Sequence, residues 1–290
     1  MQIESTHLGK QSSYPKHYDP SVLVAVPRIL NRQLYSIDND NLNFTGVDVW
    51  HAYEFSFLLK SGLPIAGLLK IVYSAESEFL IESKSLKLYL NSFNMDKYGL
   101  SAEEGIHEVL TVIIKDLSTI LKTEVKAHYF DFTKRKKQDD FSGYLILENS
   151  DDLKSVTFND YFENTNYLDE STSSGKIKWG SHLLRSNCKI TLQPDWGSVF
   201  IQMQGEKLPT KNGLLKYIIS LRNENHFHEE ICEMIFTRLI NIYNPSELTV
   251  SCLYTRRGGI DINPVRSMKR NDIPMHLKNH KVLTKMEFRQ

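Results

Sequence analysis

The segments IHEVLTVIIKDL (Ile106–Leu117) and FHEEICEMIFTRL (Phe227–Leu239) decide the fold, because they are two versions of one pattern. Three further pairs match in the same order along the chain: Leu58–Leu63 with Leu183–Cys188, Leu88–Phe93 with Lys216–Leu221, and Glu124–Arg135 with Leu248–Arg257. All four pairs are about 125 positions apart, and a constant offset indicates an internal repeat. Two copies of one module are therefore predicted, from about Val47 to Glu148 and from about Trp179 to the end.

Each copy is predicted to contain strands and then an amphipathic helix. LKLYLNSF (Leu86–Phe93) alternates leucine with other residues, which predicts a half-buried strand. Ser101 and Glu104 then have the spacing of a capping box, which opens a helix. Apolar residues recur at steps of three and four in both helices, namely at Ile106, Leu110, Ile113, Leu117 and Leu121 and at Phe227, Ile231, Met234 or Ile235, Leu239 and Ile242. Final strands are predicted around Val125–Phe132 and Leu248–Thr255.

The fold class that follows is α+β, with antiparallel sheets and helices packed on one face, because adjacent strands have short connections. We divide the chain into a module over residues 1–150 and a second over residues 151–290. Residues 151–175 are rich in Asn, Asp, Ser and Thr and are predicted to be a loop. Residues 1–46 contain three prolines and are predicted to form an irregular arm over the first module.

Composition excludes several classes of protein. The 35 basic and 35 acidic side chains give no net charge, which argues against a nucleic-acid binder with a basic face. The longest apolar runs fall far short of the roughly 20 residues that span a bilayer, and the N-terminus has no apolar signal core. Three cysteines are too few for a disulfide framework or a zinc ribbon. We expect a cytoplasmic protein with reduced thiols and no membrane partner.

The two copies differ in their reactive residues. Cys188 and Asp195 occur in the second copy, where the first has Leu63 and no carboxylate, and the charged stretch ESKSLK (82–87) occurs in the first copy alone. This division suggests one site assembled between the modules. Most free cysteines are packing residues, as we expect of Cys232 and Cys252. Cys188 instead lies in a polar, turn-like segment, where the Asp195 carboxylate could accept the thiol proton and deliver it to a nitrogen anion.

The pair His228–Glu229 begins the second predicted helix. Acidic residues suit a helix N-terminus, and His107–Glu108 at the same place in the first copy favours a structural role. A carboxylate there could also accept two hydrogen bonds from the ring N–H and exocyclic amine of a purine-like base. A metal site at His226, His228 and Glu230 is disfavoured, because residues two apart lie on different sides of a helix and no cysteine completes the set.

No glycine-rich dinucleotide or P-loop motif occurs in the sequence. Two short basic segments remain as candidates for phosphate binding: Ser83–Lys84 with Lys87, and Arg256–Gly259 (RRGG). Arginine beside glycine lets the backbone approach a phosphate while the guanidinium holds it. Taken alone, such a segment is more typical of a turn after a strand than of a phosphate site.

Four segments together resemble a known family: ESKSLKLYLNSFN (Glu82–Asn94), SNCKITLQPDWGSVFI (Ser186–Ile201), FHEE (Phe227–Glu230) and YTRRGGIDINP (Tyr254–Pro264). They resemble the bimodular NADPH-dependent 7-cyano-7-deazaguanine reductases, over the chain from about Pro15 onward. The resemblance implies two tandem tunnelling-fold modules, a homodimer, and no metal. It also implies reduction of the nitrile of 7-cyano-7-deazaguanine to a primary amine in tRNA queuosine biosynthesis, through a covalent thioimide and with two NADPH per turnover.

The resemblance further implies a role for each matching residue. Cys188 would be the nucleophile and Asp195 the proton donor. The deazaguanine would contact Ile81, Glu82, Ser83, His228 and Glu229, and NADPH would be held by Ser83, Lys84, Arg257 and Gly258. Two alternatives stay open: a non-catalytic purine- or pterin-binding module of the same fold, and a zinc-dependent cyclohydrolase, which the poor ligand set disfavours.

Overall fold

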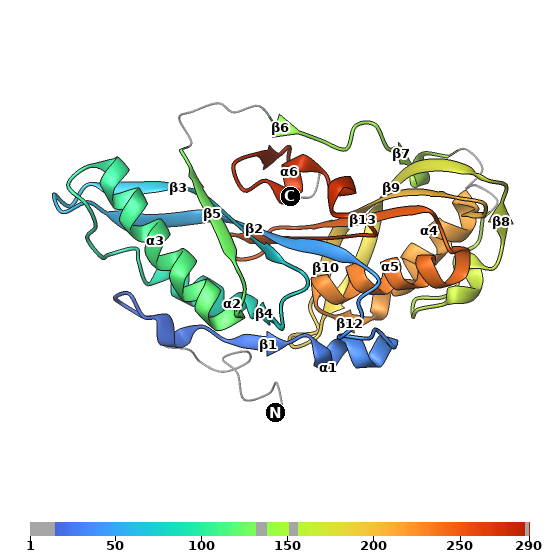
Figure 1. Ribbon diagram of the computed structural model, residues 1–290, viewed down its shortest axis with the longest axis horizontal. Helices are drawn as coiled ribbons and strands as arrows, with labels where there is room; N and C mark the ends of the chain where they lie inside the picture. Colours follow the sequence, from blue (N-terminus) through green and yellow to red (C-terminus); the bar gives the residue numbers. More distant parts are fainter. Residues whose placement is uncertain (1–14, 132–137, 151–155, 288–289) are drawn as a thin grey trace.

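One long sheet dominates the molecule (Figure 1). The computed structural model describes residues 15–131, 138–150, 156–287 and 290. Within them the strands run in the order β12-β9-β10-β13-β14-β2-β3-β5, with β7 beside β9. Neighbouring strands are antiparallel, except that β12 and β7 run parallel to β9. The α+β class with a mainly antiparallel sheet is confirmed.

The strands of this sheet are β2 (Thr45–Leu58), β3 (Pro64–Ser74), β5 (Val125–Phe130), β7 (Leu145–Ile146), β9 (Gly175–Cys188), β10 (Pro194–Gly205), β12 (Asn225–His226), β13 (Glu247–Tyr254) and β14 (Ile260–Ser267). Three short pairs accompany it: β1 (Ala25–Pro27) with β4 (Phe79–Ile81), β8 (Ser171–Thr172) with β11 (Leu208–Pro209), and β6 (Gln138–Asp139) with β15 (Leu283–Thr284). The helices are α1 (Ile29–Arg32), α2 (Ser83–Asn91), α3 (Ala102–Leu121), α4 (Lys211–Ser220), α5 (His228–Tyr243) and α6 (Met275–Lys278). In the described part of the chain, no helix is long and apolar enough to cross a membrane.

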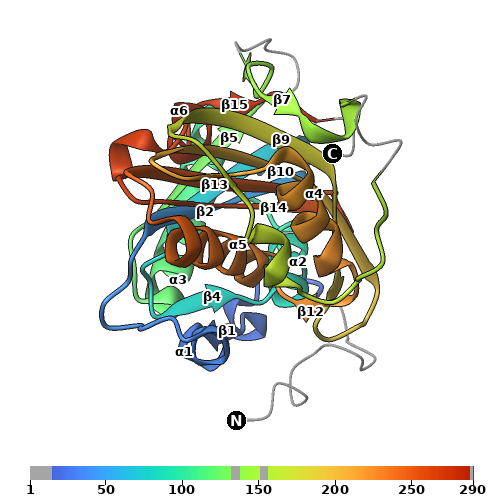
Figure 2. The ribbon, with the colours of Figure 1, turned by 90° about the vertical axis from the view of Figure 1, so that its right-hand side faces the viewer.

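The element order repeats along the chain. The series β2-β3-α2-α3-β5 recurs as β9-β10-α4-α5-β13, and the two series join where β14 pairs with β2, with Ile262 opposite Trp50. Figures 1 and 2 show the four long helices on one side of the sheet and α6 on the other. The division of the chain between residues 150 and 151 stays a prediction; β7, which precedes that point, pairs with β9, which follows it.

Helix α3 begins as its sequence predicts. The Ser101 hydroxyl accepts a hydrogen bond from the amide of Glu104 at 3.2 Å, which satisfies a free donor of the first turn. The buried side of the helix contains Val109, Ile113, Leu117 and Leu121, whereas the predicted members Ile106 and Leu110 are half-buried. The predicted stripe is therefore confirmed at Ile113, Leu117 and Leu121, and it is shifted by one residue, to Gly105 and Val109, at the start of the helix.

The predicted strand at Leu86–Phe93 is wrong, because Ser83–Asn91 form helix α2. The carboxylate of Glu82 caps this helix by accepting the amides of Lys84 and Ser85 at 2.8 and 2.7 Å. Leucines at alternate positions also include pairs four residues apart, which share one face of a helix. The counterpart segment of the second copy belongs mainly to α4, so each module has two long helices and not one.

The N-terminal arm touches both halves of the molecule. Strand β1 pairs with β4 of the first half, with Ala25 opposite Ile81. A few residues later, Arg32 of α1 forms an ion pair with Glu233 of α5 at 2.9 Å. The arm was predicted to lie over the first module; in the structure it also reaches the second, and Figure 1 shows it running below both.

Candidate active site

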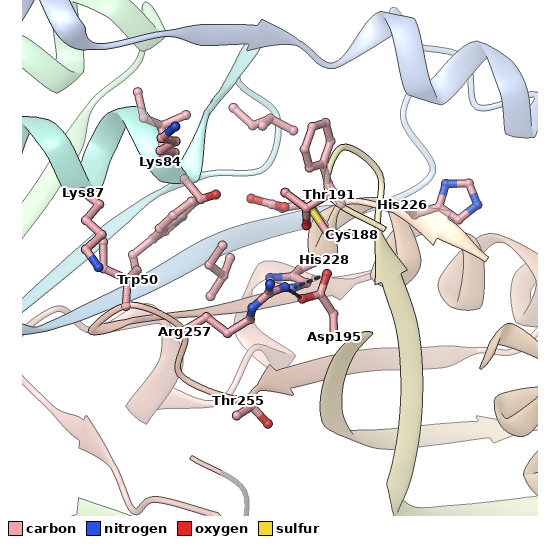
Figure 3. A pocket seen from close by; sticks show the side chains of 17 residues that line it. Trp50, Lys84, Lys87, Cys188, Thr191, Asp195, His226, His228, Thr255 and Arg257 are labelled. Atoms are coloured by element: carbon pink, nitrogen blue, oxygen red, sulfur yellow. Dashed lines mark hydrogen bonds and ion pairs between the residues drawn. The ribbon is translucent and has the colours of Figure 1, made fainter. Parts of the chain in front are cut away.

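A pocket of about 210 Å³ lies between the two halves, close to the junction of β14 with β2. Its lining comes from β2, β4 and α2 of the first half. The second half contributes β9, β10 and the turn between them, β12, α5, β14 and the β13–β14 turn. The lining residues are Trp50, Leu80, Ile81, Ser83, Lys84, Lys87, Cys188, Thr191, Asp195, His226, Phe227, His228, Glu229, Thr255, Arg257, Ile260 and Ile262. Figure 3 shows these side chains converging from segments that are distant in the sequence.

Cys188 is the last residue of β9 and begins a tight turn into β10. Its amide donates to the carbonyl of Gln193 at 2.8 Å, and its carbonyl accepts from Leu192, which has a positive φ of 56°. On its other side, Cys188 pairs with His226 of the parallel strand β12. The thiol is half-buried, whereas Cys232 and Cys252 are fully buried in the hydrophobic core of the second half. Cys188 lines the pocket, whereas Cys232 and Cys252 do not.

Asp195 stands on β10, beside the strand that ends in Cys188. Its carboxylate is 3% exposed and lies 3.4 Å from Nε2 of His228, while Nη1 of Arg257 donates to its other oxygen. Burial by itself raises the pKa of Asp195, but the hydrogen bond and charge of His228 and the charge of Arg257 outweigh it and hold the pKa below its usual value. The group is therefore a carboxylate at neutral pH.

Several buried polar atoms of the pocket have no hydrogen-bond partner within the described residues. They are Nε1 of Trp50, Nδ1 of His228, Oε1 of Glu229 and Oγ1 of Thr255. The His228 ring is held by stacking on Tyr254, with centroids 3.9 Å apart. Buried polar groups are costly without partners, so these atoms point to a polar ligand that supplies both donors and acceptors.

A basic edge borders the pocket. Lys84 and Lys87 project from successive turns of α2, and Arg257 faces them from the β13–β14 turn (Figure 3). Gly258 and Gly259 follow with φ of 56° and 79°. A Cβ at Gly258 would lie 2.5 Å from Nζ of Lys87, so glycine lets this turn approach α2 closely. Cations beside an open backbone turn fit the phosphates of a dinucleotide.

Two residues of the predicted site lie outside the pocket lining. Glu82 is 1% exposed, and both its oxygens cap α2 behind the pocket wall formed by Ile81 and Ser83. Gly258 lines a smaller adjoining cavity that shares Lys87 and Ile260 with the main pocket. Ligand contacts of Glu82 and Gly258 stay predictions.

Sequence reasoning missed Trp50, Thr191 and Thr255, which also line the pocket. Trp50 lies in a strand whose neighbours are almost all buried, so its pattern does not distinguish it from a core residue. The two threonines follow the ends of β9 and β13, where polar residues are ordinary. By contrast, His107 and Glu108 are exposed on α3, away from the pocket lining.

His226 of the neighbouring strand β12 pairs with Cys188 and also lines the pocket. Its ring nitrogens contact Glu230 at 3.0 Å and Glu224 at 3.1 Å. Burial lowers the pKa of His226, but the hydrogen bonds and charges of the two glutamates outweigh it and raise the pKa above its usual value. No group of three or more side chains suited to a metal ion occurs among the described residues.

We expect this histidine to make stability depend on pH. A pKa raised on folding contributes stability below the unfolded pKa, and this is lost as the pH rises through the folded pKa. A His226→Gln variant should therefore unfold a few degrees below the wild type at pH 6, with a smaller gap at pH 9. Thermal unfolding at both values measures it; an equal gap at both would contradict a charged His226.

Both halves of the chain match family models. Residues 14–129 match the model described as "Nitrile reductase, 7-cyano-7-deazaguanine-reductase N-term". Residues 194–272 match the model described as "QueF-like protein". Among solved structures, the chain is similar to the "archaeosine synthase QueF-Like in the apo form", with 19% identity over 34% of this chain and 95% of that one, and a TM-score of 0.29. So low a TM-score supports no conclusion about this chain.

Proposed function

Since the chain belongs to the bimodular 7-cyano-7-deazaguanine nitrile reductase family, we propose that it reduces the nitrile of 7-cyano-7-deazaguanine to 7-aminomethyl-7-deazaguanine with two NADPH, for queuosine in tRNA. The observation that carries the proposal is one pocket that contains a half-buried thiol, a carboxylate on the adjacent strand, a second buried carboxylate whose Oε1 has no partner among the described residues, and a basic edge. These are the groups that addition to a nitrile, recognition of a base and binding of a dinucleotide require.

The covalent step uses Cys188 and Asp195. The Asp195 carboxylate takes the thiol proton, the sulfur bonds to the nitrile carbon, and Asp195 returns the proton to the nitrogen to give a thioimide. When bound, NADPH would supply two hydrides, one to the thioimide carbon and one to the carbon of the imine that follows, and water would supply one proton to the nitrogen after each transfer. Between the two transfers, the carbon–sulfur bond breaks, the nitrogen gives up a proton to the departing sulfur, and the Cys188 thiol and the imine are formed. Enclosure of the imine keeps water from converting it to an aldehyde.

In the proposed complex, residues at the N-terminus of α5 would recognise the substrate. The Glu229 carboxylate would accept the ring N–H and exocyclic amine of the deazaguanine, and the stacked His228 ring, with Ile81 and Ser83, would border the base. NADPH would be held by Ser83, Lys84, Arg257 and Gly258. We further propose that the protein acts on the free base in the cytoplasm, as a homodimer.

The direct test mixes the protein with NADPH and 7-cyano-7-deazaguanine and follows the decay of nicotinamide absorbance. In parallel, mass spectrometry of the protein with the nitrile alone should show one covalent adduct, on Cys188. An adduct on Cys232 or Cys252 would reassign the nucleophile. Reversible binding with neither an adduct nor NADPH consumption would favour a non-catalytic base-binding module.

We expect Glu229→Gln to weaken substrate binding. The amide replaces one acceptor oxygen by a donor, which leaves an unpaired polar contact against the base and costs about 1–3 kcal/mol. The KM for 7-cyano-7-deazaguanine should rise while the KM for NADPH stays near that of the wild type. Glu104→Gln, on the exposed first turn of α3, is the matched control. An unchanged KM for the nitrile would mean that Glu229 only begins its helix.

A further inference from the structure

A buried cluster of charges lies behind the substrate pocket. It contains three arginines from three segments: Arg28 at the end of β1, Arg32 on α1 and Arg266 on β14, each at most 2% exposed. Two carboxylates pair with them, Asp48 of β2 and Glu233 of α5. The N-terminal arm thus supplies two of the three cations to the joint between the halves.

The contacts in this cluster are short and specific. Asp48 accepts from Arg28 at 2.5 Å and from Arg266 at 2.8 Å. Glu233 accepts from Arg266 at 2.9 Å and from both Nε and Nη2 of Arg32 at 3.0 and 2.9 Å. Two carboxylates therefore face three guanidinium groups, which leaves one positive charge in excess.

Glu229 is the remaining carboxylate at this place. It lies one helical turn before Glu233 on α5, is 3% exposed, and its Oε1 has no partner among the described residues. It lines the substrate pocket, whereas Arg28 and Asp48 do not. The excess positive charge is balanced when Glu229 is ionised. The cluster and the pocket thus share one carboxylate.

The groups around Glu229 have opposite effects on its pKa. Burial, and then the charge of Asp48, raise the pKa of Glu229 to about 8, while Arg28 and Arg266 lower it. Tyr73 of β3 also faces this place: its hydroxyl accepts from the amide of Ile81 at 3.4 Å, and the Arg28 guanidinium lies 5.9 Å from its ring centre. The proton on Glu229 is therefore sensitive to single charges in the cluster.

Resting on the proposed function, we propose that Arg28 and Asp48 are positioning residues for substrate recognition: their opposite charges set how readily Glu229 meets the base as a carboxylate. The substrate edge offers two donors, a ring N–H and an amine, and only the ionised group accepts both. Burial favours the protonated form of Glu229, so binding of the substrate releases this proton. The described part of the N-terminal arm does not line the pocket, but it takes part in recognition through Arg28.

Proton release is the first measurable consequence. With a pKa of about 8, roughly one molecule in ten has an ionised Glu229 at pH 7, so binding at that pH releases close to one proton. The affinity should rise about tenfold between pH 7 and pH 9. Calorimetry of 7-cyano-7-deazaguanine binding in buffers of different ionisation enthalpy measures both, on a Cys188→Ala background that removes the covalent step.

Two substitutions with opposite effects on the local charge distinguish a positioning role of Arg28 and Asp48 from a purely structural one. Arg28→Gln removes a cation, so the midpoint of the affinity–pH curve should move up by about one unit or more. Asp48→Asn removes an anion, so the midpoint should move down by a similar amount. Both changes destabilise the fold because each leaves a buried charge with fewer partners. A purely structural role would lower affinity in both variants and shift neither midpoint.

Ser77→Ala is the matched control, because Ser77 accepts from Nε of Arg28 at 3.3 Å but carries no charge. It should keep the wild-type midpoint. Should Arg28→Gln fail to fold, the inference is still tested by the midpoint of the affinity–pH curve of Asp48→Asn and by proton release in the protein with Arg28 and Asp48 intact. Binding without proton release, or midpoints unmoved in the folded variants, overturns the inference alone. No binding of the nitrile even on the Cys188→Ala background would instead remove the proposed function.

Discussion

A Cys188→Ala variant is expected to bind 7-cyano-7-deazaguanine and to consume no NADPH. Without the sulfur no thioimide forms, and a nitrile that stays a nitrile is a poor acceptor of hydride. Turnover should fall below detection, which makes this the largest effect that we predict. Absorbance decay measures turnover, and mass spectrometry should show no adduct after incubation with the nitrile.

Cys252→Ala is the matched control, because Cys252 is a buried thiol in the hydrophobic core of the second half and lies outside the pocket lining. It should lose some stability through the small cavity left behind, but it should keep both the adduct and turnover. Substantial NADPH consumption by folded Cys188→Ala would remove the central role of this thiol.

An Asp195→Asn variant is expected to form the adduct about 10²–10⁴ times more slowly, the usual contribution of a positioned acid–base group. The amide has nearly the same shape and its oxygen still accepts from Arg257, but it cannot take the thiol proton or return it to nitrogen. The lowered pKa of Asp195, due to His228 and Arg257 acting against burial, keeps the wild-type group ionised at neutral pH. The time course of adduct formation measures the effect.

Asp261→Asn provides the comparison for the loss of a buried carboxylate. Asp261 accepts from Nδ1 of His51 and from the Tyr53 hydroxyl, and it is not part of the pocket lining. Its variant should form the adduct at the wild-type rate whatever its stability. Equal adduct rates for Asp195→Asn and the wild type would exclude proton transfer by Asp195.

Much of the fold was predictable because its signals are local. The capping of α3 by Ser101 and the periodic stripes of α3 and α5 depend on residues within a few turns of one another. Strand β13 and the repeated element order follow from similar short patterns. The strand predicted at Leu86–Phe93 was wrong because alternation and helical spacing coincide over so short a segment, and because the capping role of Glu82 was not recognised.

The candidate site was predictable in part for the same reason. Cys188 and Asp195 lie close along the chain, so one turn brings their strands side by side. The site residues that the resemblance implies line one pocket, apart from Glu82 and Gly258. Trp50 and the threonines gave no signal because their side chains are ordinary members of their segments.

By itself, the sequence determined the repeated element order, the α+β class and the family, since each follows from patterns within short segments or from a repeated order. The division into two modules and the catalytic pairing of Cys188 with Asp195 stay predictions. Only the tertiary structure decided which face of each element meets the pocket, and that Arg28, Asp48 and Arg266 lie together behind Glu229. Those contacts join residues of the arm and of both halves, and no local pattern encodes them. They arise where β14 pairs with β2 within the one long sheet, because charges buried near this junction must find partners.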